Sequence, residues 1–140
     1  SGHFAITSSL AGKFGAPLRT GYSAAKHAVM GFFDALRTEV TADGISVSTI
    51  TPGSIATAVS ANALRGDGER FGITDQRIAN GMDVDDCAQQ IVEGLINKAR
   101  EIAVSEPKEM AILHLKREDP ERCFDRLESM AGILRAEGIY

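Results

Sequence analysis

The 140-residue sequence predicts an α/β fold with a parallel sheet of about three strands and flanking helices. Two observations predict it. Short apolar runs, partly β-branched, at residues 4–7, 45–50 and 101–104 are typical of buried strands. Longer segments with apolar residues three and four apart lie between and after them, as in helices. Alternating strands and helices form right-handed crossovers and a parallel sheet. Because three strands make a small sheet, we expect one edge to be uncovered.

The first helix is predicted at about residues 21–42, ending at Asp43-Gly44. Its apolar stripe consists of Ala25, Val29, Phe32, Leu36 and Val40. Asp83 is expected to cap the next helix. The inward face of that helix is expected to be Val84, Ala88, Ile91, Val92 and Leu95. Pro107 and Pro120 begin two further helices, since proline is tolerated in a first turn.

Composition argues against several classes of protein. The net charge is −4 and no basic face stands out, so no nucleic acid partner is expected. No apolar run reaches the roughly 18 residues that span a bilayer, so no membrane segment is expected. Cys87, Cys123 and the three histidines lack the spacing of metal ligands, which predicts no metal site and two reduced thiols in a cytoplasmic protein. The first residue is Ser1 rather than Met, which fits a fragment or a processed chain and leaves an upstream targeting signal open.

Tyr22 and Lys26 lie four residues apart at the start of the first helix and therefore share a face. An ammonium near a phenol stabilises the phenolate, which suits a tyrosine that donates or accepts a proton. Such a pair is useful where a carbonyl is reduced or an alcohol is oxidised. Taken alone it is weak evidence, because a solvated lysine packed on a tyrosine ring is the commoner explanation.

Polar and glycine-containing segments follow the first two strands. Ser8 and Ser9 end the first strand, and Ser9 precedes Tyr22 by thirteen residues. Open parallel sheets bind ligands at the carboxyl ends of their strands, where a serine hydroxyl could contact a reacting oxygen. The alternative is an ordinary turn or cap serine. The second strand is followed by Pro52, Gly53, Ile55 and Thr57. These residues offer exposed backbone groups and, from Thr57, a hydroxyl at the same edge of the sheet.

Together these segments resemble the second half of a classical short-chain dehydrogenase/reductase. The resemblance lies in ITSSLAGK at residues 6–13, YSAAKHA at 22–28 and PGSIAT at 52–57, in that order and spacing. It covers roughly residues 2–104. It implies the C-terminal part of a Rossmann-like, doubly wound parallel sheet. Residues 1–104 would be the catalytic half of this domain, and residues 105–140 a C-terminal helical extension of it.

The resemblance also implies roles. Tyr22 would be the general acid/base, Lys26 would bind the nicotinamide ribose and stabilise the Tyr22 phenolate, and Ser9 would orient the substrate oxygen. Pro52 and Gly53 would line the nicotinamide side of the cleft. Ile55 and Thr57 would contact the carboxamide and a nearby phosphate. The activity would be NAD- or NADP-dependent hydride transfer to or from a small carbonyl or secondary alcohol. Residues 58–80 would cover the substrate. The protein would form a homo-oligomer through the helix that carries Tyr22. The apolar stripe of this helix plus Phe33 is wide enough to contact both the sheet and a partner subunit.

Two alternatives stay open. The glycine-rich phosphate-binding turn expected after a first strand is absent from these residues, so the chain could be a truncated, catalytically incompetent module for oligomerisation or interaction. Related extended enzymes that share the Tyr-x-x-x-Lys pair are epimerases, dehydratases or isomerases. The short segment after Val104 argues mildly against that chemistry.

Overall fold

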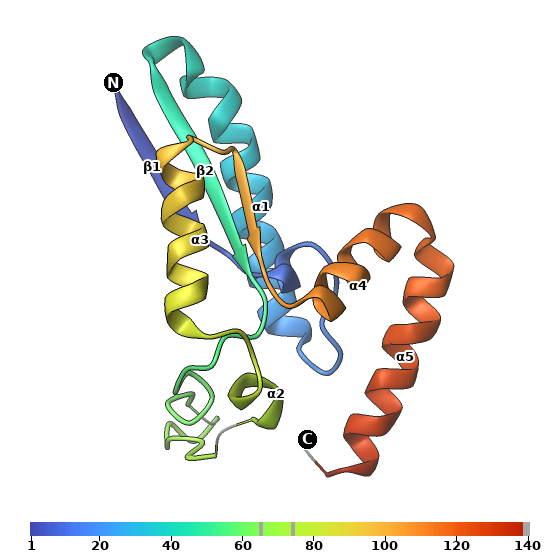
Figure 1. Ribbon diagram of the computed structural model, residues 1–140. Coiled ribbons are helices and arrows are strands. Elements are labelled where there is room, and N and C mark those ends of the chain that lie inside the picture. Colours follow the sequence, from blue (N-terminus) through green and yellow to red (C-terminus); the bar gives the residue numbers. More distant parts are fainter. Residues whose placement is uncertain (65, 74, 139–140) are drawn as a thin grey trace.

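The protein is built around a parallel β-sheet with helices on both faces (Figure 1). The computed structural model describes residues 1–64, 66–73 and 75–138. In these ranges the sheet has three strands in the order β1-β2-β3: β1 (Gly2–Thr7), β2 (Ile45–Pro52) and β3 (Glu101–Val104). The helices are α1 (Thr20–Val40), α2 (Gln76–Ala79), α3 (Val84–Ile96), α4 (Pro107–Glu118) and α5 (Pro120–Ala136). The predicted α/β fold is therefore confirmed.

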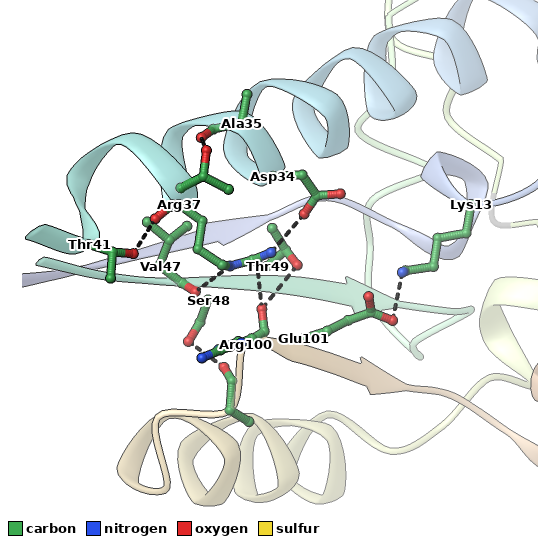
Figure 2. Close-up of polar contacts among 12 residues, drawn as sticks. Lys13, Asp34, Ala35, Arg37, Thr41, Val47, Ser48, Thr49, Arg100 and Glu101 are labelled. Carbon is green, nitrogen blue, oxygen red and sulfur yellow. Dashed lines mark hydrogen bonds and ion pairs between the residues drawn. The ribbon is translucent and has the colours of Figure 1, made fainter.

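Two helical crossovers order the strands. α1 connects β1 to β2 and α3 connects β2 to β3, and the two helices lie on opposite faces of the sheet (Figures 1 and 2). This doubly wound arrangement brings the carboxyl ends of the strands to one edge, where such folds bind ligands. β2 is the central strand and is buried over residues 47–51. Among the described residues β1 pairs only with β2, and its residues are mostly exposed, which is the uncovered edge expected for so small a sheet.

The buried face of α1 differs from the predicted stripe. In this helix the buried residues are Ser23 and Met30, whereas Phe32 is 63% exposed. Of the other residues in the predicted stripe, Ala25 is exposed, whereas Val29, Leu36 and Val40 are half-buried. Only part of the stripe meets the sheet, because α1 packs on the central strand β2 and the sheet has only three strands in the described residues. Much of its apolar surface therefore has nothing to pack on within the described chain.

The face of α3 is rotated in the same way. Cys87 is buried and Ile91 and Leu95, four and eight residues later, pack beside it over the β2–β3 pair. The predicted inward residues Val84 and Val92 are instead 44% and 52% exposed, and Ala88 is exposed. The core on this side of the sheet is formed by Ile50, Cys87, Ile102 and Val104.

Polar contacts tie the elements together at the opposite face (Figure 2). The Arg37 guanidinium of α1 donates to the carbonyl oxygens of Val47, at 3.2 Å, and Arg100, at 2.8 Å. The Lys13 ammonium, in the loop after β1, lies 2.6 Å from a carboxylate oxygen of Glu101 in β3. These contacts hold α1 and the loop that follows Ser9 against the sheet.

A second core joins the C-terminal helices to the loop after β1. It consists of Leu10, Phe14, Ile112, Leu113, Cys123 and Leu127. The described part of the segment beyond residue 104 therefore packs on the Ser9 loop; residues 139–140 lie outside the described residues. Both cysteines are free and buried, and burial raises the pKa of the Cys87 thiol. No helix in the described ranges is long and apolar enough to cross a membrane.

Candidate active site

Ser9 joins the ends of two strands. It follows β1 directly and caps a short 3-10 turn (Leu10–Gly12), where its hydroxyl oxygen accepts from the Ala11 N–H at 3.1 Å. The same hydroxyl donates to the Pro52 carbonyl oxygen at 3.4 Å, at the end of β2. The bond is long and therefore weak, so the hydroxyl could donate a hydrogen bond to another oxygen instead.

Tyr22 and Lys26 both lie in the first two turns of α1. The Lys26 nitrogen is 5.6 Å from the centre of the Tyr22 ring, within the range of a cation–π contact. Tyr22 is 45% exposed, so its phenol is open to a ligand. The buried Ser23 hydroxyl accepts from the Ala16 N–H at 3.0 Å, which fixes the loop that leads into the helix.

Ser8 connects β1 to that helix. Its buried hydroxyl donates to the Lys26 carbonyl oxygen at 3.0 Å. Gly12 permits the approach: a Cβ at this position would lie 2.7 Å from both the Lys26 carbonyl oxygen and the Ser8 hydroxyl oxygen. The Ser8-Ser9 pair is thus held at the turn that carries Lys26, with Ser8 turned to the helix and Ser9 to Pro52.

The segment after β2 approaches α4 closely. The Gly53 N–H donates to the Val104 carbonyl oxygen at 2.9 Å. A Cβ on Gly53 would overlap the Ser105 and Glu109 side chains, so glycine is required by this contact. Ser54 donates to the Glu109 carboxylate twice, from its N–H at 3.0 Å and from its hydroxyl at 2.7 Å.

Ile55 presents a free peptide edge. It forms a parallel bridge with Met82, in which the Met82 N–H donates to the Ser54 carbonyl oxygen and the Ala56 N–H donates to the Met82 carbonyl oxygen, both at 2.9 Å. In this pattern the N–H and C=O of Ile55 itself point away from Met82. They have no hydrogen-bond partner in the described parts of the chain. Thr57 is exposed, and its hydroxyl oxygen accepts from the Val59 N–H at 3.4 Å.

The long segment between β2 and α3 is fastened to the start of α1. Asp75, whose side chain is 8% exposed, lies 2.6 Å from the Arg77 guanidinium and 3.2 Å from that of Arg19. The hydrogen bond from Arg77 is the main reason that the pKa of Asp75 lies below its usual value, although burial acts in the opposite direction. Residues 65 and 74 of the predicted lid lie outside the described residues.

A cavity of about 740 Å³ opens between this segment and the end of α5. Phe71 and Ile73 line it from the loop, Leu134 from α5, and Arg19 and Lys108 add positive charge. None of Ser9, Tyr22 and Lys26 lines it. The described residues hold no group of three or more His, Cys, Asp or Glu side chains that could bind a metal.

The structure thus links Ser9 directly to Pro52 and, through Ser8, to the turn of Lys26; Gly53 and Ile55 continue the same edge. Thr57 bonds to Val59 instead, and Tyr22 contacts Lys26. Sequence reasoning missed Glu109 and Asp75. No local signal marks either as part of a site, because each acquires its role from a partner 55 or 56 residues away.

Known proteins share sequence and fold with this chain. A family model described as short chain dehydrogenase matches residues 1–67. The chain is 41% identical over 116 residues to Dehydrogenase/reductase SDR family protein 7-like of Drosophila melanogaster, covering 83% of this chain and 36% of that protein. It is 36% identical over 130 residues to Dehydrogenase/reductase SDR family member 7B of Bos taurus, covering 93% and 40%. The chain therefore spans well under half the length of these relatives.

Solved structures share the fold at low sequence identity. A short chain dehydrogenase/reductase from Burkholderia phymatum, in complex with NAD, superposes with a TM-score of 0.69 at 21% identity, over 85% of this chain and 48% of that one. A short chain dehydrogenase from Burkholderia cenocepacia, in complex with NADP, also gives 0.69, at 18% identity and over 89% and 46%. These likenesses establish the Rossmann-like fold. The family model and the curated relatives show that the chain belongs to the short-chain dehydrogenase/reductase family.

Proposed function

We propose that the protein is an NAD- or NADP-dependent oxidoreductase that transfers hydride between nicotinamide and a small carbonyl or secondary alcohol. The observation that carries the proposal is the bond from Ser9 to Pro52 beside the helix turn of Tyr22 and Lys26. A phenol and an ammonium one helical turn apart, together with a serine hydroxyl at the ligand-binding edge of the sheet, are the groups that carbonyl reduction or alcohol oxidation requires. The names of the relatives, and the NAD and NADP bound to the structural neighbours, support the same chemistry.

The residues after β2 fit a nicotinamide. A carboxamide has an NH2 group that donates and a carbonyl oxygen that accepts, and the free N–H and C=O of Ile55 are their complement. Gly53 has no side chain that would block the approach of a ring. Neighbours with NAD and with NADP are equally similar in fold, so both dinucleotides stay candidates.

Tyr22 would carry the proton. A bound reduced nicotinamide supplies the hydride for a carbonyl carbon, or the oxidised form accepts it from an alcohol. In the reduction, the Tyr22 phenol donates its proton to the substrate oxygen, so that a C–H and an O–H bond form together; oxidation reverses both steps. The Lys26 ammonium stabilises the phenolate that remains. Ser9 turns its hydroxyl from Pro52 to the substrate oxygen and orients it.

Tyr22→Phe tests this assignment in the protein at its full natural length. We expect turnover of a panel of aldehydes, ketones and secondary alcohols to fall by about 10²-fold or more, because the general acid is lost. Affinity for NADH or NADPH should stay within a few fold. Thr20→Ala, an exposed change in the same helix turn, is the control. Undiminished turnover of the Tyr22 variant would refute the assignment.

A second candidate is a non-enzymatic module, favoured by the uncovered β1 strand and the exposed Phe32. The 140-residue chain on its own would then associate through these surfaces without binding a dinucleotide. Titration of NADH and NADPH into this chain, followed by cofactor fluorescence, separates the two ideas. Saturable binding excludes the module. A cytoplasmic location, the homo-oligomer and the domain division at residue 104 remain predictions.

A further inference from the structure

We propose that Glu109 is a positioning residue that holds residues 52–57 from behind, and so presents the Ile55 peptide edge to the nicotinamide. The inference rests on the proposed function and deepens it. It assigns a role to α4, which lies beyond the residues matched by the family model and carries no recognisable motif.

The contacts of Glu109 converge on one residue. Its carboxylate accepts from the Ser54 N–H, at 3.0 and 3.3 Å to the two oxygens, and from the Ser54 hydroxyl at 2.7 Å. Hydrogen bonds to a charged acceptor are roughly twice as strong as neutral ones. The first turn of α4 is a favourable place for a carboxylate, because the N-terminal end of a helix carries partial positive charge. The side chain therefore fastens a backbone amide firmly.

Two backbone hydrogen bonds also hold this segment. The Gly53 N–H donates to the Val104 carbonyl oxygen in β3, and the Ser54 carbonyl oxygen accepts from the Met82 N–H. Among the described residues, Glu109 supplies the only side-chain hydrogen bonds that reach Gly53, Ser54 or Ile55 from elsewhere in the chain. Together the three anchors restrain the backbone next to Ile55, so that its N–H and C=O stay turned away from Met82. The Glu109 side chain also packs so closely on Gly53 that a Cβ at Gly53 would overlap it. Residues 52–57 therefore cannot move toward α4.

Loss of the anchor should affect the nicotinamide end of the dinucleotide and spare the remainder. ADP-ribose, which lacks nicotinamide, provides the comparison. In the protein at its full natural length, Glu109→Ala should weaken NADH and NADPH binding by about tenfold, as expected for losing charged hydrogen bonds. ADP-ribose affinity should stay within about twofold. Glu109→Gln keeps one acceptor oxygen and should show an intermediate loss.

Ser54→Ala removes only the hydroxyl bond and keeps the backbone bond, so it should give a smaller loss in the same direction. It decides the question should Glu109→Ala fail to fold. Glu118→Gln, an exposed carboxylate on the same helix, is the matched control and should change neither ligand. Calorimetric titration measures each affinity, and thermal unfolding checks each variant.

The inference is overturned if the Glu109 and Ser54 variants weaken NADH and ADP-ribose equally, which would show a merely structural role. Unchanged NADH affinity overturns it as well. Failure of the proposed function has a different signature, because the wild-type protein would then bind neither NADH nor NADPH.

Discussion

The Ser8 hydroxyl donates to the Lys26 carbonyl oxygen at 3.0 Å and so joins the end of β1 to the helix turn that carries the candidate catalytic pair. Adjacent serines thereby acquire different tasks. Ser8 is buried and committed to the helix, whereas Ser9 is half-buried and bonded weakly to Pro52. The family resemblance implies that Ser9 is the substrate-orienting residue, and these bonds supply a physical reason to prefer it to Ser8.

The two serines should respond differently to alanine. Ser8→Ala should lower the free energy of unfolding by about 1 kcal/mol, the usual net value of a buried hydrogen bond, with a modest effect on turnover. Ser9→Ala should lower turnover at least about tenfold, because a donor to the reacting oxygen is lost. Urea unfolding and steady-state kinetics of both variants provide the measurement. A larger loss of turnover in Ser8→Ala than in Ser9→Ala would reverse the assignment.

Gly12 should not tolerate a methyl group. The Cβ of Gly12→Ala would lie 2.7 Å from the backbone oxygen of Lys26, which cannot move without distorting α1. We expect a loss of about 1–3 kcal/mol in the free energy of unfolding, as for other overpacked sites. Gly15→Ala, in the same loop with nothing within 4 Å, should change stability by less than about 0.5 kcal/mol. Equal effects of the two changes would contradict the close approach.

Asp75 should make stability depend on pH in the acid range. Hydrogen bonding from Arg77 holds the pKa of Asp75 below its usual value, so folding favours the ionised carboxyl. Its contribution is fully present above the unfolded-state pKa of about 3.9 and is lost as pH falls through the lower folded-state pKa. Asp75→Asn should therefore be less stable than wild type at neutral pH, by about 1–2 kcal/mol.

That difference should shrink as the pH falls below about 4, because the carboxyl then takes up a proton in the unfolded state and, at still lower pH, in the folded state too. Urea unfolding across the range measures it. Asp67→Asn, a change in the exposed part of the same loop, should show little difference at any pH. A gap between wild type and Asp75→Asn that stays constant down to pH 2 would rule out this ion pair as its source.

Phe32 should contribute to self-association. It is 63% exposed on α1 and stacks edge-on with Phe33, their ring centres 5.1 Å apart. A charge in a subunit interface is costly, so Phe32→Lys should shift the protein toward monomer. Val92→Lys on α3, also an exposed apolar residue, should leave the assembly unchanged. Sedimentation velocity gives the masses; an unaltered oligomer in Phe32→Lys would exclude this face.

Much of the secondary structure could be predicted because its signals are local. Residues 101–104 were predicted as a strand and form β3, and the strands predicted at 4–7 and 45–50 are extended by two residues each. Pro107 and Pro120 begin α4 and α5 as expected. Asp83 caps α3 as predicted, accepting from the Asp85 and Asp86 N–H groups. Each of these signals depends on a residue and its immediate neighbours.

The buried faces of the helices could not be predicted in the same way. Apolar periodicity identified α1 and α3 as helices but did not indicate which side met the sheet. Apolar residues surround more of each helix than a three-stranded sheet can cover, and packing selected Cys87 over Val84 and Met30 over Phe32.

The candidate site divides along the same line. Tyr22 and Lys26 are one helical turn apart, so their proximity follows from the sequence once the helix is recognised. Ser9 meets Pro52 across 43 residues, and Ser54 meets Glu109 across 55. Those contacts exist only because parallel strands align their carboxyl ends and because α4 folds back on them. The sequence by itself determined that Tyr22 and Lys26 share one helix turn. Only the packed tertiary structure determined which distant residues hold Ser9 and Ser54 in place.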